Sequence, residues 1–417
     1  MSLSRRGFLK TCGFSVASLT LVGCKTNASS GTQTNPECAS NLPPSYLSDY
    51  KELYQQNPRQ AALAWFKDAK FGMFIHYGLY SILGQGTWAL KNKKIPLDKY
   101  DKLKDKFTAK KFDADFITDL AITAGMKYVN LTSKHHDAFC LFGSAYSDYN
   151  SVNSPAKRDL VAELAEQCQK KRLGLFLYYS YALDWRHPYF YPSQYCDISR
   201  FDLDNPEPGY KFRKEEDFKK YIDFAHSQLR ELLSNYGPLA GIWFDPMTSY
   251  YARPDLFPIE ETYAMIRKLQ PQTLISFKQG ATGTEDFASP ERSGKLNYGW
   301  VEKRFPDRPL SLQVAKNACE KNTGKHNEIC DTLQRRKWGY YPPENKNHLN
   351  SEEVFQRLGA AGAINCNLLL NTGPLPDGSI HKDDVRTLRT VGKTKPTVQV
   401  DSNSYNKDTV VDQGMAQ

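Results

Sequence analysis

Short apolar runs alternate along the chain with longer amphipathic segments. The apolar runs are Phe71–Tyr77, Tyr128–Ser133, Leu173–Ser180, Leu239–Met247, Thr273–Phe277 and Ala363–Leu370. A run of this kind is typical of a strand buried on both faces. Between the runs, segments such as Asp159–Arg172 place Leu160, Leu164 and Cys168 at helical spacing. The pattern therefore predicts strands that alternate with helices.

Further helices are predicted in the segments between the apolar runs and after the last of them. They are Ala61–Asp68, Asp113–Ala124, Glu215–Asn235, Ile259–Leu269, Ser351–Ala361 and Asp383–Lys393, and Lys91–Lys111 is a predicted polar loop. The alternation from Phe71 to Lys393 favours an α/β fold, a (β/α)8 barrel of the TIM type, over an open sheet. No dinucleotide-type glycine loop follows the first run, which argues against a Rossmann fold.

The first 24 residues have the pattern of an export signal. Ser4–Lys10 contains twin arginines, Gly13–Gly23 is apolar, and Cys24 closes a lipobox-like site. The apolar run is shorter than the ~20 residues of a membrane span, which disfavours the alternative of an uncleaved anchor. We expect cleavage before Cys24, lipidation of its thiol, and a periplasmic or outer-membrane-associated bacterial lipoprotein. The remaining predicted parts are a tether (25–48), the catalytic barrel (49–393) and a tail (394–417).

Charge and cysteine content exclude some functions. Removing residues 1–23 takes away three basic residues and no acids, so the formal net charge falls from +9 to +6. The remaining bases are scattered among nearly as many acids, which makes nucleic-acid binding a poor hypothesis. Seven cysteines follow Cys24 without C-x-x-C spacing, and they indicate neither a zinc site nor a disulfide framework.

Unusual polar and aromatic residues collect at the ends of the predicted strands. They are His76, His135, His136, Tyr179, Trp243, Asp245 and Lys278. In a parallel barrel the carboxyl ends of the strands form one rim, where catalytic residues collect. By itself, Asp245 before Pro246 would be read as a turn cap. Its position among the other strand ends favours a functional role.

Two chemistries suit this set of residues. Histidines with an aspartate can ligate a metal, but adjacent His135 and His136 point to opposite sides of an extended segment, which disfavours one shared ion. Neutral imidazoles and phenols with indole faces suit a sugar better. Glycoside hydrolysis also needs a second carboxylate near the rim. Composition alone does not choose among Glu285, Asp286, Glu291 and Glu302.

The chain resembles the α-L-fucosidases of glycoside hydrolase family 29 over roughly residues 60–393. The matching motifs are WFKDAKFGMFIHYGLYS (65–81), KYVNLTSKHHDAF (127–139), RDLVAEL (158–164), LYYSYALDW (177–185), GIWFD (241–245), DFASPE (286–291), WGYYP (338–342) and NLLLNTGPLPDG (367–378). The resemblance implies an irregular (β/α)8 barrel. It also implies an exo-acting, retaining α-L-fucosidase of glycans that forms a glycosyl-aspartate intermediate and needs no metal or other cofactor. It implies Asp245 as nucleophile and Glu291 as acid/base. The sugar contacts that it implies are His76, Trp88, His135, His136, Tyr179 and Trp243.

Two expectations about the carboxyls follow from the implied mechanism. Double displacement places them about 5–5.5 Å apart. Asp245 has to stay ionised, so we expect hydrogen-bond donors around it. Glu291 has to hold a proton, so we expect a less polar setting or a nearby negative charge to raise its pKa.

Four positions depart from the family's usual motifs. Ala138 replaces glycine in H-H-D-G-F, Tyr77 replaces tryptophan in H-W-G, Thr87 replaces glutamate before Trp88, and Lys278 stands where relatives often carry arginine. Lys278, as a substrate contact, lacks the bidentate fork of arginine. Two alternatives therefore stay open: a weakly catalytic glycan-binding relative, and a hydrolase of a related sugar such as an α-galactoside. We also expect no C-terminal β-sandwich after the barrel.

Overall fold

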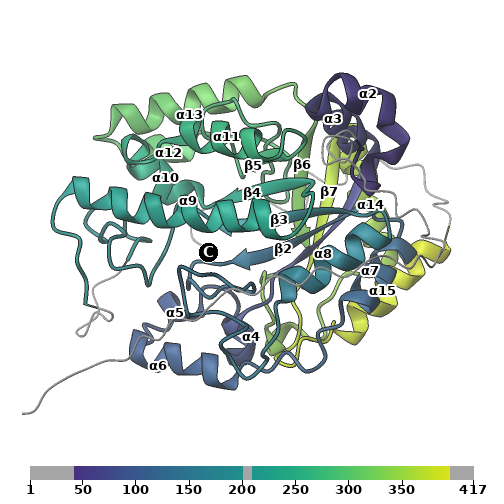
Figure 1. The fold of residues 1–417 in the computed structure, drawn as a ribbon, viewed down its shortest axis with the longest axis horizontal. Helices are drawn as coiled ribbons and strands as arrows, with labels where there is room; N and C mark the ends of the chain where they lie inside the picture. The colour runs from purple at the N-terminus through teal and green to yellow at the C-terminus, as the bar shows by residue number, and fades with distance from the viewer. Residues whose placement is uncertain (1–41, 201–208, 395–417) are drawn as a thin grey trace, which may run out of the picture. The chain divides into compact units, whose positions relative to one another are not determined.

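A computed structural model describes residues 42–200 and 209–394, which contain a single parallel sheet (Figure 1). Its strand order is β5-β4-β3-β2-β1-β7-β6, and every paired strand is parallel to its neighbour. The strands are β1 Phe71–Ile75, β2 Tyr128–Lys134, β3 Gly174–Ser180, β4 Gly241–Asp245, β5 Leu274–Phe277, β6 Asn327–Thr332 and β7 Cys366–Thr372. All residues of these strands are buried, as expected where helices cover one face and barrel side chains fill the other.

Helices connect the strands and lie outside the sheet (Figure 1). The longer ones are α3 Pro58–Ala69, α7 Ala114–Thr123, α8 Leu160–Lys170, α9 Phe218–Asn235, α11 Ile259–Leu269, α13 Pro309–Asn322, α14 Ser351–Ala363 and α15 Lys382–Lys393. The shorter ones are α2 Lys51–Gln56, α4 Leu79–Leu83, α5 Ala89–Asn92, α6 Leu97–Asp101, α10 Met247–Ala252, α12 Gly299–Arg304 and the 3-10 turns η1 Ser45–Tyr50, η2 Lys102–Lys106, η3 Glu215–Asp217, η4 Pro254–Leu256 and η5 Pro342–Glu344. Side chains of Asp113, Asp159 and Asn350 cap α7, α8 and α14 by accepting a bond from a backbone N–H of the first turn.

Aromatic side chains fill the interior of the barrel. Phe74, Tyr128, Phe176 and Trp243 pack there, and Trp65 of α3 packs against them from the amino-terminal end. Glycines of the inner face make the room: a Cβ on Gly241 would lie 2.1 Å from the Phe176 ring. The interior is thus a packed core, and only the carboxyl-terminal end of the barrel is left for a site.

An irregular segment, residues 286–292, takes the eighth position of the barrel, between β5 and β6. It makes isolated parallel bridges to both neighbours, Ser276 with Phe287 and Cys330 with Glu291. The Arg292 N–H donates to the Cys330 carbonyl at 3.0 Å. Pro290 lacks an N–H and cannot take part in a regular ladder as a donor. The barrel therefore closes through a segment without strand structure, which confirms the predicted irregular (β/α)8 fold.

The apolar runs located six of the strands, but β6 was missed. Its sequence N-E-I-C-D-T carries two acids, so it does not read as a buried run. Helix α13 was also missed, and the predicted loop 91–111 contains the end of α5 together with α6 and η2. Folded structure begins within the predicted tether, because Tyr46 and Leu47 of η1 are buried.

The export signal with Cys24, most of the tether and nearly all of the tail lie outside the described residues, so these predictions remain predictions. In the described part of the chain, no helix combines the length and apolarity needed to cross a bilayer.

Candidate active site

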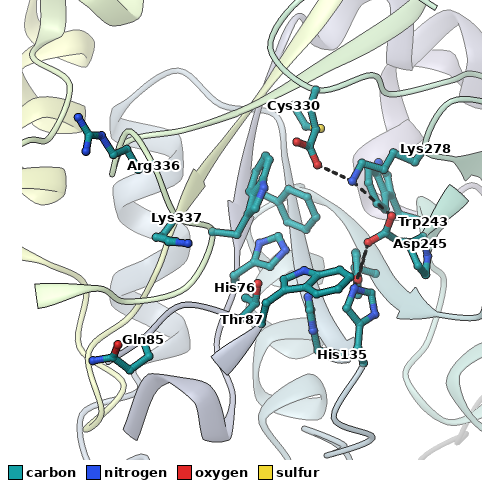
Figure 2. Close-up of a pocket in the computed structure, with 17 residues that line it drawn as sticks. His76, Gln85, Thr87, His135, Trp243, Asp245, Lys278, Cys330, Arg336 and Lys337 are labelled. Carbon is teal, nitrogen blue, oxygen red and sulfur yellow. Dashed lines mark hydrogen bonds and ion pairs between the residues drawn. The ribbon is translucent and has the colours of Figure 1, made fainter. Parts of the chain in front are cut away.

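A pocket opens at the carboxyl ends of the strands and contains eight of the nine residues predicted for the site of the barrel (Figure 2). These are His76, Trp88, His135, His136, Trp243, Asp245, Lys278 and Glu291. They come from β1, β2, β4, β5 and their following loops, and Glu291 comes from the segment 286–292. The structure thus brings together residues that are up to 215 positions apart in the sequence, from His76 to Glu291.

Asp245 is the last residue of β4 and is buried, with 6% of its surface exposed. The Tyr178 hydroxyl donates to its Oδ2 at 2.8 Å, and the Lys278 Nζ lies 3.5 Å from its Oδ1. Burial raises the pKa of this carboxyl, while the Lys278 charge and the Tyr178 bond oppose the rise and leave it above its ordinary value. The donors expected around Asp245 are present, yet burial outweighs them.

Glu291 forms an ion pair with the same Lys278 ammonium. Burial alone would raise the pKa of Glu291, but the Lys278 charge and hydrogen bond more than offset it and hold the pKa below its ordinary value. The expectation from the sequence that the pKa of Glu291 is raised is therefore wrong. The reason is the cation that lies between the two carboxylates.

Lys278 connects the two carboxylate-bearing segments through its main chain as well. Its N–H donates to the Phe244 carbonyl of β4 at 3.2 Å, and its own carbonyl accepts from the Ser289 N–H at 2.5 Å. One residue directly after β5 therefore holds the residue preceding Asp245 and the segment that carries Glu291. Because both carboxylates contact one ammonium nitrogen, they are close neighbours.

Hydrogen bonds define the tautomers of two pocket histidines. The Asn371 Nδ2 donates to the Trp338 carbonyl at 2.7 Å, so its Oδ1 accepts from His76 Nδ1 at 2.7 Å. Likewise the Ser180 hydroxyl donates to the Leu183 carbonyl at 2.5 Å and accepts from His136 Nδ1 at 2.6 Å. In both rings Nε2 is then the acceptor.

The three histidines of the pocket are neutral near pH 7. Burial is the largest cause and lowers the pKa of His76 to about 3, and it lowers the pKa values of His135 and His136 well below their ordinary value. Nε2 of His136 lies 3.7 Å from Asp245 Oδ2. The pocket therefore offers neutral rings, beside a carboxylate, to the hydroxyls of a ligand.

A buried carboxylate, Glu328 of β6, lies beneath the pocket. It accepts from the Trp243 indole N–H at 3.1 Å, the Ser289 hydroxyl at 2.7 Å and the Tyr128 hydroxyl at 2.5 Å. Burial raises its pKa to about 7, although all three bonds oppose the rise. Glu328 thereby connects Trp243, two residues before Asp245, with Ser289, two residues before Glu291.

Tyr179, the ninth predicted residue, lies outside the pocket, and this prediction is wrong. Its hydroxyl donates to Gln228 of α9 at 2.8 Å, while Tyr178 lines the pocket and pairs in register with Trp243. Side chains alternate along a strand, so only one of the two tyrosines can face inward. Trp243 and Asp245 face inward, and Tyr178 pairs with Trp243 in the sheet. This register would have identified Tyr178 as the tyrosine that faces inward.

Sequence reasoning also missed pocket residues that come from loops. Trp338 lies with its ring centroid 5.2 Å from that of His76, and Arg336 and Lys337 precede it in the loop after β6. The W-G-Y-Y-P motif marked Trp338 as a matching position without indicating where it would lie.

The other acids considered for the second carboxylate have structural partners or lie elsewhere. Glu285 accepts from the N–H groups of Ala281 and Gly283, and Asp286 forms a 2.6 Å ion pair with Arg59. Glu302 lies exposed on α12. Of the four acids, Glu291 alone lines the pocket.

No metal is implied by the arrangement of side chains. In the described ranges, no three His, Cys, Asp or Glu side chains gather as ligands for an ion, and the six cysteines there are free thiols. The chemistry available in the pocket is that of two carboxylates, two ammonium groups, one guanidinium, three neutral imidazoles and several aromatic faces.

Comparison with known proteins gives one consistent result. A family model described as Alpha-L-fucosidase matches residues 39–394. Plasma alpha-L-fucosidase of Rattus norvegicus is 28% identical over 385 residues, which cover 82% of this chain and 71% of the rat protein. The human plasma enzyme is 27% identical over 370 residues, covering 79% of this chain and 66% of the human protein.

Solved structures agree with the sequence matches. Alpha-L-fucosidase isoenzyme 1 from Paenibacillus thiaminolyticus has a TM-score of 0.66 and 33% identity, and the match covers 81% of this chain and 76% of that one. Alpha-L-fucosidase AlfC from Lactobacillus casei, in complex with alpha-L-fucose product, has a TM-score of 0.63 and 30% identity, with 80% and 97% covered.

Proposed function

The chain belongs to the alpha-L-fucosidase family of glycoside hydrolases, and we propose that it removes terminal α-L-fucosyl groups from glycans by a retaining, two-step mechanism. In this proposal Asp245 is the nucleophile and Glu291 is the acid/base. The observation that supports it best is the contact of both carboxylates with the single Lys278 ammonium, since double displacement requires two neighbouring carboxyl groups.

The first step forms a bond between an Asp245 oxygen and the anomeric carbon while the bond to the leaving oxygen breaks. Glu291 gives its proton to that oxygen, and the aglycone departs as an alcohol. In the second step Glu291 takes a proton from water, whose oxygen attacks the anomeric carbon and releases Asp245 as a carboxylate. Every proton that Glu291 gives in the first step is recovered in the second.

Lys278 has to change partners during this cycle. In the structure the Lys278 ammonium contacts Glu291 and lowers its pKa, whereas the first step needs Glu291 protonated. We infer that a bound fucoside separates Lys278 from Glu291, and that the ammonium then stays with Asp245 alone. Loss of the contact with Lys278 raises the pKa of Glu291, so that this residue can hold a proton. The remaining contact of Lys278 with Asp245 keeps Asp245 charged for attack.

The neutral histidines suit the recognition of sugar hydroxyls. His76 and His136 each present an accepting Nε2, and the Trp88, Trp243 and Trp338 rings supply apolar faces. Thr87 lines the same pocket where many relatives are expected to have a carboxylate. We therefore expect the enzyme to discriminate less strongly between sugars that differ at the hydroxyls this carboxylate would bind.

Hydrolysis of nitrophenyl glycosides tests the proposal. Wild-type protein is assayed on the α-L-fucoside, the β-D-fucoside and the α-D-galactoside, and Asp245→Ala is assayed beside Asp223→Ala, which changes an exposed aspartate of α9. We expect α-L-fucoside turnover that only Asp245→Ala abolishes, with α-L-fucose as the first product by NMR.

Each other outcome has a defined meaning. Fucoside binding without turnover would show a glycan-binding relative, and faster galactoside turnover would show a different sugar specificity. Turnover that survives Asp245→Ala, or β-L-fucose as the first product, would contradict the assigned nucleophile or the retaining course.

We further propose that the protein is exported and held at a bacterial membrane by a lipid on Cys24. The support is the order of twin arginines, apolar run and lipobox-like site in the sequence. Cell fractionation tests this, because Cys24→Ala should move the enzyme from the membrane fraction to the soluble fraction. An unchanged distribution would contradict the lipid anchor.

A further inference from the structure

The loop after β6 brings two cations to the mouth of the pocket. Arg336 and Lys337 both line it, together with Gln85 from the loop after α4. Figure 2 shows these three residues across the pocket from Asp245. The Arg336 side chain is largely exposed, so this side of the pocket faces solvent, into which the group attached to a bound fucose has to extend.

Within residues 42–200 and 209–394, the Lys337 ammonium has no carboxylate partner. Its Nζ lies over the Tyr341 ring, 5.8 Å from the centroid. Its side chain is half-buried between the pocket and the Gly86 turn, where a Cβ on Gly86 would contact its Cδ at 3.1 Å. The ammonium is thus held at the mouth while its charge is left unpaired.

Arg336 adds a second positive charge that is only weakly neutralised. Its side chain is 76% exposed, and its Nε lies 3.6 Å from Glu344 Oε1, beyond hydrogen-bond distance. Among the described residues that line the pocket, the acids are Asp245 and Glu291, and both already contact Lys278. Neither lining acid therefore contacts Arg336 or Lys337, and both cations remain available to a ligand at the mouth.

We propose that Arg336 and Lys337 form an aglycone subsite for an anionic group, a carboxylate or a sulfate, on the residue to which the fucose is attached. An ammonium and a guanidinium at a pocket mouth bind such oxyanions directly and raise the local concentration of anionic substrates. The enzyme then prefers fucosides of acidic glycans to those of neutral ones. This inference rests on the proposed fucosidase activity and adds the substrate class.

Matched aryl fucosides test the subsite. The probes are the α-L-fucosides of 3- and 4-hydroxybenzoate with those of the corresponding methyl esters, and the α-L-fucoside of 4-hydroxybenzenesulfonate with that of its sulfonamide. The measured quantity is the ratio of kcat/KM for the anionic probe to that for its neutral partner, determined for each enzyme. Because leaving-group reactivity is the same for every enzyme, changes in this ratio between variants report the charge of the mouth alone.

We expect Lys337→Met to lower the ratio about fivefold for at least one ring position, the effect of losing one partly exposed charge pair. Arg336→Gln should also lower the ratio, whereas Lys337→Arg should retain the wild-type ratio. Lys268→Met, which removes an exposed lysine of α11, is the matched control and should leave the ratio unchanged. Raising NaCl from low to 0.5 M should lower the wild-type ratio and leave the Lys337→Met ratio nearly constant.

The outcomes separate this inference from the proposed function. Absence of turnover for all probes would contradict the fucosidase activity itself. Turnover of every probe with equal ratios in wild type and Lys337→Met would overturn the anionic subsite and leave the activity standing. A carboxylate effect without a sulfonate effect, or the reverse, would support the subsite and show which anion it takes.

Discussion

Replacing Glu328 with glutamine should change how the stability of the protein depends on pH. Burial raises the pKa of Glu328 from the ordinary 4.5 to about 7 in the folded state. An acid with a raised pKa binds its proton more tightly when folded, so its contribution to stability is fully present below pH 4.5 and is lost as pH rises through 7. The difference between the two pKa values corresponds to roughly 3 kcal/mol of unfolding free energy.

Glutamine cannot ionise, so Glu328→Gln loses this dependence. Its oxygen can still accept from Trp243 and Ser289, and its amide can donate to the Tyr128 hydroxyl, so the geometry is retained. We expect the unfolding free energy of the variant, relative to wild type, to rise by roughly 2.5 kcal/mol between pH 5 and pH 8. The variant should therefore be relatively more stable in alkaline than in acidic solution.

Urea unfolding at pH 5, 6, 7 and 8 measures this difference, with Glu302→Gln on the exposed face of α12 as the control. The control should show no change in its difference from wild type across the series. If the Glu328→Gln difference stays constant with pH, or moves in the opposite direction, then Glu328 is not held in a site that disfavours its charge.

Substitutions at three further positions test the pocket. Lys278→Met removes the cation shared by Asp245 and Glu291, so it should raise both carboxyl pKa values, move the acidic limb of kcat/KM against pH upward and lower kcat/KM at least about 100-fold, as removal of one partner from a buried pair predicts. Lys278→Arg should restore most of the activity, and an unshifted acidic limb in Lys278→Met would contradict the shared contact. Tyr178→Phe removes the hydroxyl bonded to Asp245 and should lower kcat about tenfold or more, the strength of a hydrogen bond to a charged group. Tyr179→Phe changes a ring that lies outside the pocket and should affect kcat less than twofold, so equal effects of the two variants would refute the assigned strand faces.

The sequence allowed the barrel and most of the site to be predicted, because a buried strand and its polar end are both visible in the residue pattern. The failures have a physical cause. Strand β6 contains Glu328 and Asp331, whose partners come from distant segments, so the strand looked polar. Tyr178 and Tyr179 are chemically identical in sequence, and only the register with β4 decides which faces inward.

The ionisation of the two pocket carboxyls could not be predicted from the sequence for a related reason. The sequence indicated Lys278 as a substrate contact, but its position between Asp245 and Glu291 depends on three separate strand ends meeting. The expected proton on Glu291 was therefore assigned without the charge that opposes it. Spatial neighbours, rather than the nature of each residue, determine which acid is ionised.

The segment 286–292 gives the two carboxylates of the pocket unequal freedom to evolve. Asp245 is part of β4, which pairs with strands on both sides, so a one-residue insertion there would shift every side chain that follows to the opposite face. Glu291 is held by isolated bridges and by Lys278, so the length of its segment can change without altering the register of any neighbouring strand. In the proposed mechanism, a lineage can therefore relocate its proton donor, and adapt to new leaving groups, while the attacking carboxylate stays where the barrel fixes it.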